Sequence, residues 1–406
     1  MPEQAAERLQ AAAELFAESG DRAGAARAAV ERAVLLEARE GLSPRIRAHE
    51  EAYRVGIQTA DSRLVSTSAQ QLAFLTAGHS RLTSETWVER AATATRSDDE
   101  HGVATVHLAD AWAHVTTMSP VRGLAAAEAA MRIATEAGAD FVFRNALAIA
   151  CECALVMGDL EQAAAHLVAL DAVAARRPNP RSRQTELGFA ALLAAYSGRP
   201  EAATQALAAA RTGEGADEPV FDRFHTYNEG VVALRRGDFS TAAASGVAAL
   251  ALDTQLDQPL EALNSRLLVL RANVARREWV SLNEGLSLPR EAQERGAGDL
   301  ATVARQWLRL DDLLRGETET ELPDDLPDLA ESRALQLETL ALRDRQPELL
   351  LEAAREWSTL GATIWPARAL IWHTALTGEE HPEVEGILAS VGADPAIVGF
   401  FAGQVS

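Results

Sequence analysis

Hydrophobic and polar residues follow the 3.6-residue period of amphipathic helices along most of the chain, and short turn motifs interrupt these helical segments at regular intervals. Successive turns lie about 40 residues apart, and each separates two Ala-rich segments. No segment is predicted as a strand. The pattern therefore predicts an all-α chain of helix–turn–helix repeats. The predicted turns are at 77–79, 118–120, 157–159, 197–199, 236–238, 276–278 and 315–317, with a similar one at 19–21.

The residues of each turn explain why one helix ends there and the next begins. Gly158 and Gly237 can adopt the left-handed conformation that ends a helix, and the aspartate that follows each can cap the next helix. Small residues such as Ala163 then allow the second helix to pack closely on the first. Neither helix can bury its apolar stripe alone, so neighbouring repeats are expected to stack into an α–α superhelix.

The segment 228–242 carries this pattern most completely, with Gly230 and Gly237 followed by Asp238, Phe239 and Ala242. In this it resembles the tetratricopeptide repeat (TPR) family. Other repeats keep the turn but lose the first glycine, and the unit has about 40 residues where the family's classical unit has 34. The longer unit is similar to the TPR region of MalT-like and large ATP-binding LuxR-type bacterial regulators.

The resemblance covers roughly residues 5–316 and implies a non-enzymatic scaffold or sensor for transcriptional or signalling regulation. Such a scaffold would bind a protein, a peptide or a small effector in its concave groove. Regulators of this type place an NTPase before the repeats and a helix-turn-helix after them, and this sequence has neither. We therefore expect an excised sensor segment or a stand-alone relative, and an array that opens directly in a helix favours the first.

The chain is predicted to divide into a repeat array over 1–316, an acidic Pro-containing loop over 317–328 and a C-terminal helical cap over 329–406. Trp357, Trp365 and Trp372 concentrate in the cap. We expect them to fill its core. The alternative is that they form a docking surface, which would make the chain an oligomeric structural adaptor.

Composition narrows the possible functions. The net charge of −21 predicts that this segment does not bind nucleic acid directly, because an acidic surface repels phosphate. All 38 basic residues are Arg, which excludes mechanisms that need a P-loop or Schiff-base lysine.

No apolar run is long enough to cross a membrane. Cys151 and Cys153 are expected to be buried thiols, and the lack of a disulfide framework predicts a cytoplasmic setting. No cofactor is predicted.

His107, Asp110 and His114 form the best polar constellation, because their spacing places all three on one helical face. The two histidines are about 10 Å apart along the axis at 1.5 Å per residue. A shared metal would therefore need ligands from another helix. We expect a polar groove face, and an enzyme or metal-dependent accessory protein on an α–α scaffold is the alternative function.

In the TPR family the first helix of each repeat lines the groove, at positions about thirteen, ten and six residues before the turn. Phe224 and Tyr227 are the preferred anchors, although both could simply pack between helices. A basic cluster over 176–183 is expected to be a solvated loop paired with acids, or else to dock an acidic partner. The resemblance assigns to the groove His107, Asp110, His114, Asn145, Glu152, Phe224, Tyr227, Asn264, Arg271 and Gln306.

Overall fold

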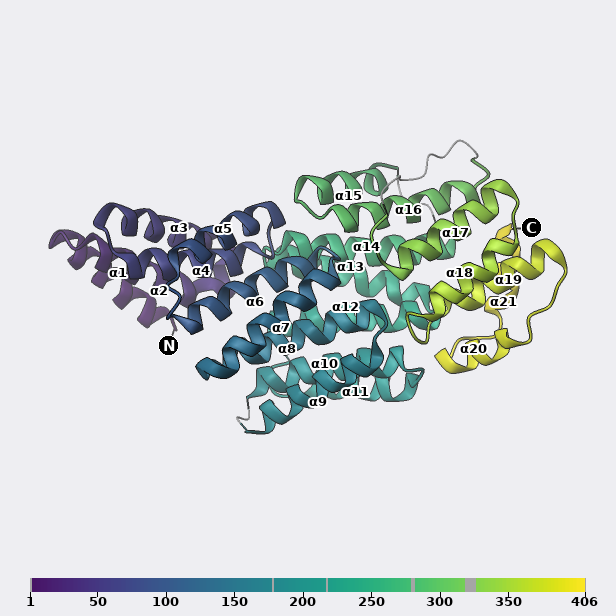
Figure 1. The fold of residues 1–406 in the computed structure, drawn as a ribbon, viewed down its shortest axis with the longest axis horizontal. Coiled ribbons are helices and arrows are strands. Elements are labelled where there is room, and N and C mark those ends of the chain that lie inside the picture. Colours follow the sequence, from purple (N-terminus) through teal and green to yellow (C-terminus); the bar gives the residue numbers. More distant parts are fainter. Residues whose placement is uncertain (1, 177–178, 217, 279–281, 318–325, 406) are drawn as a thin grey trace. The chain divides into compact units, whose positions relative to one another are not determined.

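The computed structural model describes residues 2–176, 179–216, 218–278, 282–317 and 326–405, and every regular element in these ranges is a helix (Figure 1). Helices that follow one another in the chain pack against one another, which confirms the predicted all-α repeat class. The helices are α1 (Pro2–Glu18), α2 (Arg22–Glu40), α3 (Leu42–Thr59), α4 (Ser62–Thr76), α5 (Arg81–Ala94), α6 (Glu100–Thr116), α7 (Pro120–Ala137), α8 (Asp140–Met157), α9 (Leu160–Arg176), α10 (Pro180–Tyr196), α11 (Pro200–Thr212), α12 (Pro219–Arg236), α13 (Phe239–Gln255), α14 (Pro259–Arg276), α15 (Leu282–Glu294), α16 (Gly298–Leu314), α17 (Ala330–Asp344), α18 (Glu348–Ser358), α19 (Trp365–Thr377), α20 (Glu383–Val391) and α21 (Ile397–Val405).

The predicted turns join consecutive helices in the predicted way. Gly158, between α8 and α9, has a φ of 81°, in the left-handed region. Asp159 then accepts a hydrogen bond from the backbone amide of Gln162 at 2.9 Å, which is the predicted cap of α9. Gly237 and Asp238 repeat this geometry between α12 and α13. The helix-ending and helix-starting chemistry of these turns is therefore confirmed.

Several turns without glycine use the same backbone conformation. Ala60 ends α3 with a φ of 56°, Met118 follows α6 at 61°, and Arg277 follows α14 at 54°. A non-glycine residue is strained in this region because its Cβ approaches a neighbouring carbonyl oxygen. The geometry of the repeat therefore imposes the left-handed turn even where the residue disfavours it.

Contacts between residues divide the chain into two compact units. Unit 1 comprises Met1–Ala150 with Leu252–Glu261, and unit 2 comprises Cys151–Ala251 with Ala262–Ser406. Helices α1 to α7 lie wholly in unit 1, and α9 to α12 and α15 to α21 lie wholly in unit 2. The predicted loop 317–328 lies mostly outside the described residues, so the predicted boundaries at 316 and 329 stay predictions.

A long-range cap in unit 1 joins α3 to the segment Leu252–Glu261. Gly41 precedes α3 and has no side chain with which to cap it. Asp257 takes this role from far along the chain, because its Oδ2 accepts a hydrogen bond from the Ser43 amide at 3.1 Å and another from the Ser43 hydroxyl. Asp257 is itself left-handed, with a φ of 56°. One strained residue therefore satisfies the helix terminus that Gly41 leaves open.

In unit 2, a strap of residues 359–364 crosses the turn ends of three earlier repeats. The strap amide of Ala362 donates to the carbonyl of Tyr196 at the end of α10, at 2.7 Å. The amide of Ile364 donates to the carbonyl of Arg235 near the end of α12, at 2.9 Å. These carbonyls lie in the last turns of their helices, where intrahelical donors run out. The strap therefore supplies the missing donors.

Side chains and glycines hold the strap in place. The Arg235 guanidinium donates to the strap carbonyls of Ala362 at 2.9 Å and Leu360 at 2.5 Å, and it lies 3.4 Å from the centre of the Tyr196 ring. At the turn between α8 and α9, a Cβ added to Gly158 would lie only 2.0 Å from the carbonyl oxygen of Thr359. This turn accordingly requires glycine for the close approach of the strap as well as for its φ.

Four tryptophans surround a buried ion pair in the C-terminal part of unit 2. Arg368 and Glu338 are 1% and 0% exposed, and their Nη2 and Oε2 atoms are 2.5 Å apart. Replacing either residue alone would leave the other as an uncompensated buried charge, which would strongly destabilise the fold. The guanidinium carbon lies within 6 Å of the ring centres of Trp307, Trp357, Trp365 and Trp372.

All three tryptophans predicted to fill the cap core are buried, with exposed fractions of 5% or less. The expectation of a cap core is confirmed. The alternative docking surface loses its anchors, because none of these rings reaches the surface. The oligomeric adaptor is left without support from these residues.

Cys151 and Cys153 are free and completely buried, as expected. Burial raises the pKa of the Cys151 thiol to about 12, so this side chain is a protonated, unreactive part of the core. Among the described helices, none has the length and apolar content that crossing a membrane requires.

Candidate functional site

Helix α6 carries the polar constellation that the sequence singles out. It begins at an N-cap, Asp99, whose carboxylate accepts a hydrogen bond from the Gly102 amide at 3.0 Å. The side-chain amide of Gln70 on α4 donates a hydrogen bond to the Thr95 hydroxyl at 2.9 Å, which ties the connection between α5 and α6 to α4. Ala104, Ala109 and Ala111 are fully buried and let α6 lie close to its neighbours. The helix is therefore held firmly before any ligand arrives.

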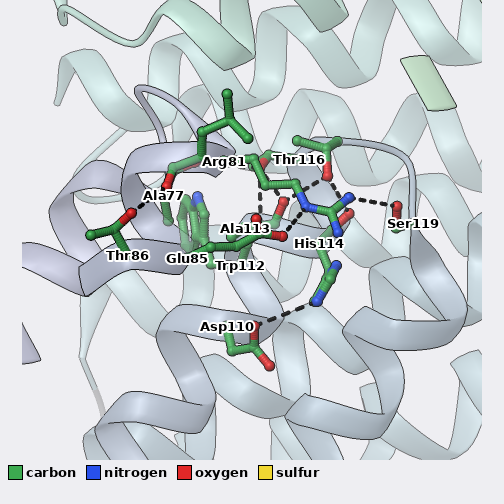
Figure 2. Close-up of polar contacts among 12 residues, drawn as sticks. Ala77, Arg81, Glu85, Thr86, Asp110, Trp112, Ala113, His114, Thr116 and Ser119 are labelled. Atoms are coloured by element: carbon green, nitrogen blue, oxygen red, sulfur yellow. Dashed lines mark hydrogen bonds and ion pairs between the residues drawn. The ribbon is translucent and has the colours of Figure 1, made fainter. Parts of the chain in front are cut away.

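Asp110 and His114 face each other across one turn of α6 (Figure 2). Asp110 Oδ1 and His114 Nε2 are 3.5 Å apart, and the side chains are 34% and 10% exposed. Burial lowers the pKa of His114, and nearby Arg81 and Arg122 lower it further, while the Asp110 carboxylate opposes them. His114 is therefore neutral near pH 7, and it does not neutralise Asp110.

Arg81, at the start of α5, lies beside this pair (Figure 2). Its Nε donates to Glu85 at 2.7 Å and its Nη1 donates to Ser119 at 3.4 Å. The arginine is thus engaged by its own helix and by the turn before α7. It acts on His114 through its charge, and the Asp110 side chain stays 34% exposed.

A pocket of about 220 Å³ opens between α5 and α6. Two of the predicted binding residues, His107 and Asp110, lie on its α6 side. The rest of the lining is mainly apolar, and it consists of Val88, Ala92, Thr95, Val103 and Val106. A cavity of this size is below the range of drug-sized ligands, so it suits a single side chain or a small molecule.

A packed core supports the pocket walls. Val106 belongs to a buried cluster with Leu72 and Trp87, and Val88 packs against that cluster. Tyr53 packs on Trp87 edge-to-face with ring centres 5.0 Å apart. Side chains fixed in this way keep a pocket open and shaped without a ligand, which lowers the entropy lost on binding.

The predicted face of His107, Asp110 and His114 is therefore divided. His107 and Asp110 line the pocket, whereas His114 is buried behind Asp110. Within the part of the chain that the structure describes, no three His, Cys, Asp or Glu side chains are grouped closely enough to hold one metal ion. Of these three residues, Asp110 offers a partly exposed carboxylate beside the apolar walls of the pocket.

Two further predicted groove residues lie on α8. Asn145, in unit 1, donates its side-chain amide to the Phe141 carbonyl at 2.7 Å, so that donor serves its own helix. Glu152, in unit 2, is partly buried.

The two predicted aromatic anchors lie on α12. Phe224 packs edge-to-face on Phe189 of α10, with ring centres 5.5 Å apart, which favours the alternative that it packs between helices. Tyr227 is half-buried beneath the guanidinium of Arg223, which lies 5.0 Å from the ring centre. Of the two rings, Phe224 has the clearer structural role.

The remaining predicted residues lie on α14 and α16, where α17 engages two of them. Arg271 forms a bidentate ion pair with Glu331, at 2.8 Å and 2.5 Å. Gln306 is 2% exposed and exchanges hydrogen bonds with Ser332. Both side chains are therefore already engaged by residues of α17. Asn264, also on α14, is half-buried.

The α5 wall of the pocket escaped the sequence analysis. Val88, Ala92 and Thr95 lie at i, i+4 and i+7, which is the spacing of one helical face. That spacing was available in the sequence, but it is also the ordinary pattern of a helix packed on a core. What marks a pocket is that the facing α6 residues do not fill the space, and this depends on tertiary packing.

Two described arginines of the basic cluster pair with acids, as one interpretation expected, but the predicted loop is wrong for the described arginines because Arg176 ends α9 and Arg181 and Arg183 lie in the first turn of α10. Arg181 pairs with Glu218 at 2.6 Å, and Arg183 pairs with Glu186. Residues 177–178 lie outside the described residues.

No family model matches the chain, and no curated protein matches it. The resemblance to tetratricopeptide repeats therefore stays a prediction based on the repeat motif.

Proposed function

We propose that this chain is a non-enzymatic helical-repeat scaffold that binds a protein, a peptide or a small ligand at the pocket between α5 and α6. The observation that carries the proposal is an open pocket with apolar walls and two polar side chains, His107 and Asp110, on one side. A mostly apolar lining with a few placed polar groups is the usual form of a recognition site.

The wider role rests on the resemblance. The TPR-like turn pattern supports a sensor or scaffold in transcriptional or signalling regulation, because proteins with such repeats are recognition modules. Two free thiols, Cys151 and Cys153, support the predicted cytoplasmic setting.

A variant that fills the pocket tests the proposal directly. Ala92 lines the pocket and is exposed on α5, so Ala92→Phe should block the cavity without disturbing the core. The adjacent Thr93 is also exposed and does not line the pocket, so Thr93→Phe adds the same ring to the same helix as a control.

The measurement is ligand-observed saturation-transfer NMR with a panel of small apolar, cationic and anionic fragments. At least one fragment class should bind the wild type and Thr93→Phe and lose its signal with Ala92→Phe. Identical fragment binding by all three proteins would remove the pocket from the account.

A second candidate function is an enzyme that uses Asp110 and His114 as an acid–base pair. The observation in its favour is their 3.5 Å separation, together with a histidine kept neutral and hence able to accept a proton. The two functions are separated by incubating the protein with a ligand that binds the pocket and measuring by mass spectrometry whether the ligand is converted. Conversion that disappears in His114→Gln would favour the enzyme, and an unchanged ligand supports the scaffold.

A further inference from the structure

We infer that the α5–α6 pocket selects an aliphatic cation, a primary ammonium group carried on a short apolar chain. This inference rests on the proposed function of the pocket and adds the chemical class of its ligand. Three features of the described residues carry it: the apolar walls, the size of the cavity and the charge at its edge.

The walls and the size fit a short alkyl chain. Val88 and Ala92 on α5 face Val103 and Val106 on α6 across the cavity. Transferring an alkyl chain from water to such walls contributes about 0.8 kcal/mol for each buried CH₂ group. A volume of about 220 Å³ holds a chain of four or five atoms and excludes large ring systems.

The charge at the edge selects a cation. Among the described residues, the imidazole of His114 lies against the Asp110 carboxylate, with Nε2 and Oδ1 3.5 Å apart. That histidine is largely buried and its pKa is lowered, so it carries no compensating charge near pH 7. The Asp110 carboxylate is one-third exposed and lies in the lining, where an ammonium group could reach it. The net charge of −21 adds a long-range preference for cations over anions.

The same chemistry can come from a free alkylamine or from a lysine side chain of a partner. The chain itself has no lysine, so it offers no such group of its own. Two probes distinguish the sources: n-butylammonium for a free amine, and Nα-acetyl-lysine N-methylamide for a peptide side chain. The uncharged 1-butanol has the same number of heavy atoms as n-butylammonium and reports binding to the walls alone.

The test is a methyl NMR titration of the full chain that follows Val88, Val103 and Val106. Asp110→Asn removes the charge at almost constant shape. Glu89→Gln is the matched control, because Glu89 is an exposed acid on α5 that does not line the pocket. In the wild type and Glu89→Gln, n-butylammonium should bind about two- to fivefold more tightly than 1-butanol, as a partly exposed ion pair allows.

Asp110→Asn should bind n-butylammonium and 1-butanol with equal affinity, and in the wild type added salt should weaken only the binding of the cations. Tighter binding of the blocked lysine than of n-butylammonium would identify a peptide as the source, and the reverse order would identify a free amine. Equal affinity of the wild type for n-butylammonium and 1-butanol would overturn the inference and leave a binding pocket. A titration that shifts none of the three valines would overturn the inference, and the fragment panel with Ala92→Phe then decides whether the pocket binds anything.

Discussion

Replacing Gly158 with alanine should loosen the strap, whereas the same change at Gly316 should not. Both glycines are left-handed, with φ of 81° and 88°, so alanine introduces a similar backbone strain at each. That strain costs about 1 kcal/mol, part of which is offset by the reduced freedom of the unfolded chain. The two positions differ in their surroundings. Among the described residues, an added Cβ meets nothing within 4 Å at Gly316, whereas it meets the carbonyl oxygen of Thr359 at 2.0 Å at Gly158.

The contact at Gly158 forces the strap to move. A non-bonded carbon and oxygen must be more than 3 Å apart, so the backbone at Thr359 must shift by about 1 Å or more. Overpacking of this kind typically costs about 1–3 kcal/mol of stability. The strap amides of Ala362 and Ile364 would then pair less well with the carbonyls of Tyr196 and Arg235. Opening of the strap should become about fivefold to a hundredfold more frequent.

Hydrogen–deuterium exchange of peptides that cover 359–364 measures this opening. Gly158→Ala should exchange these amides faster than the wild type, and Gly316→Ala should leave their exchange unchanged. Equal exchange in the two variants would refute the argument that the strap is held against the repeat turns.

Three further outcomes follow from particular contacts. Ala60→Gly should stabilise the C-terminus of α3 by about 0.5–1 kcal/mol, since an exposed left-handed alanine is relieved, and thermal unfolding measures this gain. Asp257→Ala should weaken the first turn of α3 by about 1 kcal/mol, and Asp257→Asn, which keeps an acceptor oxygen, should preserve most of the exchange protection near Ser43. Burial lowers the pKa of His225 to about 4, below its ordinary value of about 6.5, so its contribution to stability is complete above pH 6.5 and is lost as the pH falls through about 4. Exchange in α12 should accelerate over this range in the wild type and less in His225→Gln, and NMR titration of the imidazole measures the pKa.

Local chemistry made the repeat predictable. A glycine followed by aspartate, as at Gly158 and Gly237, encodes both the end of one helix and the cap of the next within a few residues. Buried alanines at fixed offsets, such as Ala163, encode the close packing of a pair. All these features depend on neighbours along the chain, which a sequence displays directly.

The long-range contacts were not predictable in the same way. The strap brings Thr359 against Gly158, and this close approach requires glycine. The left-handed turn requires glycine at the same position, so the residue alone does not reveal the contact with the strap. Asp257 caps α3 across 214 residues, and an aspartate in a turn has many commoner roles. Arg271 was expected in an open groove, and its pairing with Glu331 depends on where α17 packs.

The candidate site was predictable in part for the same reason. His107 and Asp110 share a helical face, and periodicity places them together. Their facing wall on α5 and the burial of His114 behind Asp110 follow from how two helices pack. The pocket therefore emerged only from the tertiary structure.

A crystal structure of the chain soaked with n-butylammonium tests the central claim most directly. We expect the alkyl chain to lie between the valines of α5 and α6, with its nitrogen about 3 Å from a carboxylate oxygen of Asp110. An empty pocket at a saturating concentration of the amine, or the amine bound only elsewhere on the chain, would contradict the account.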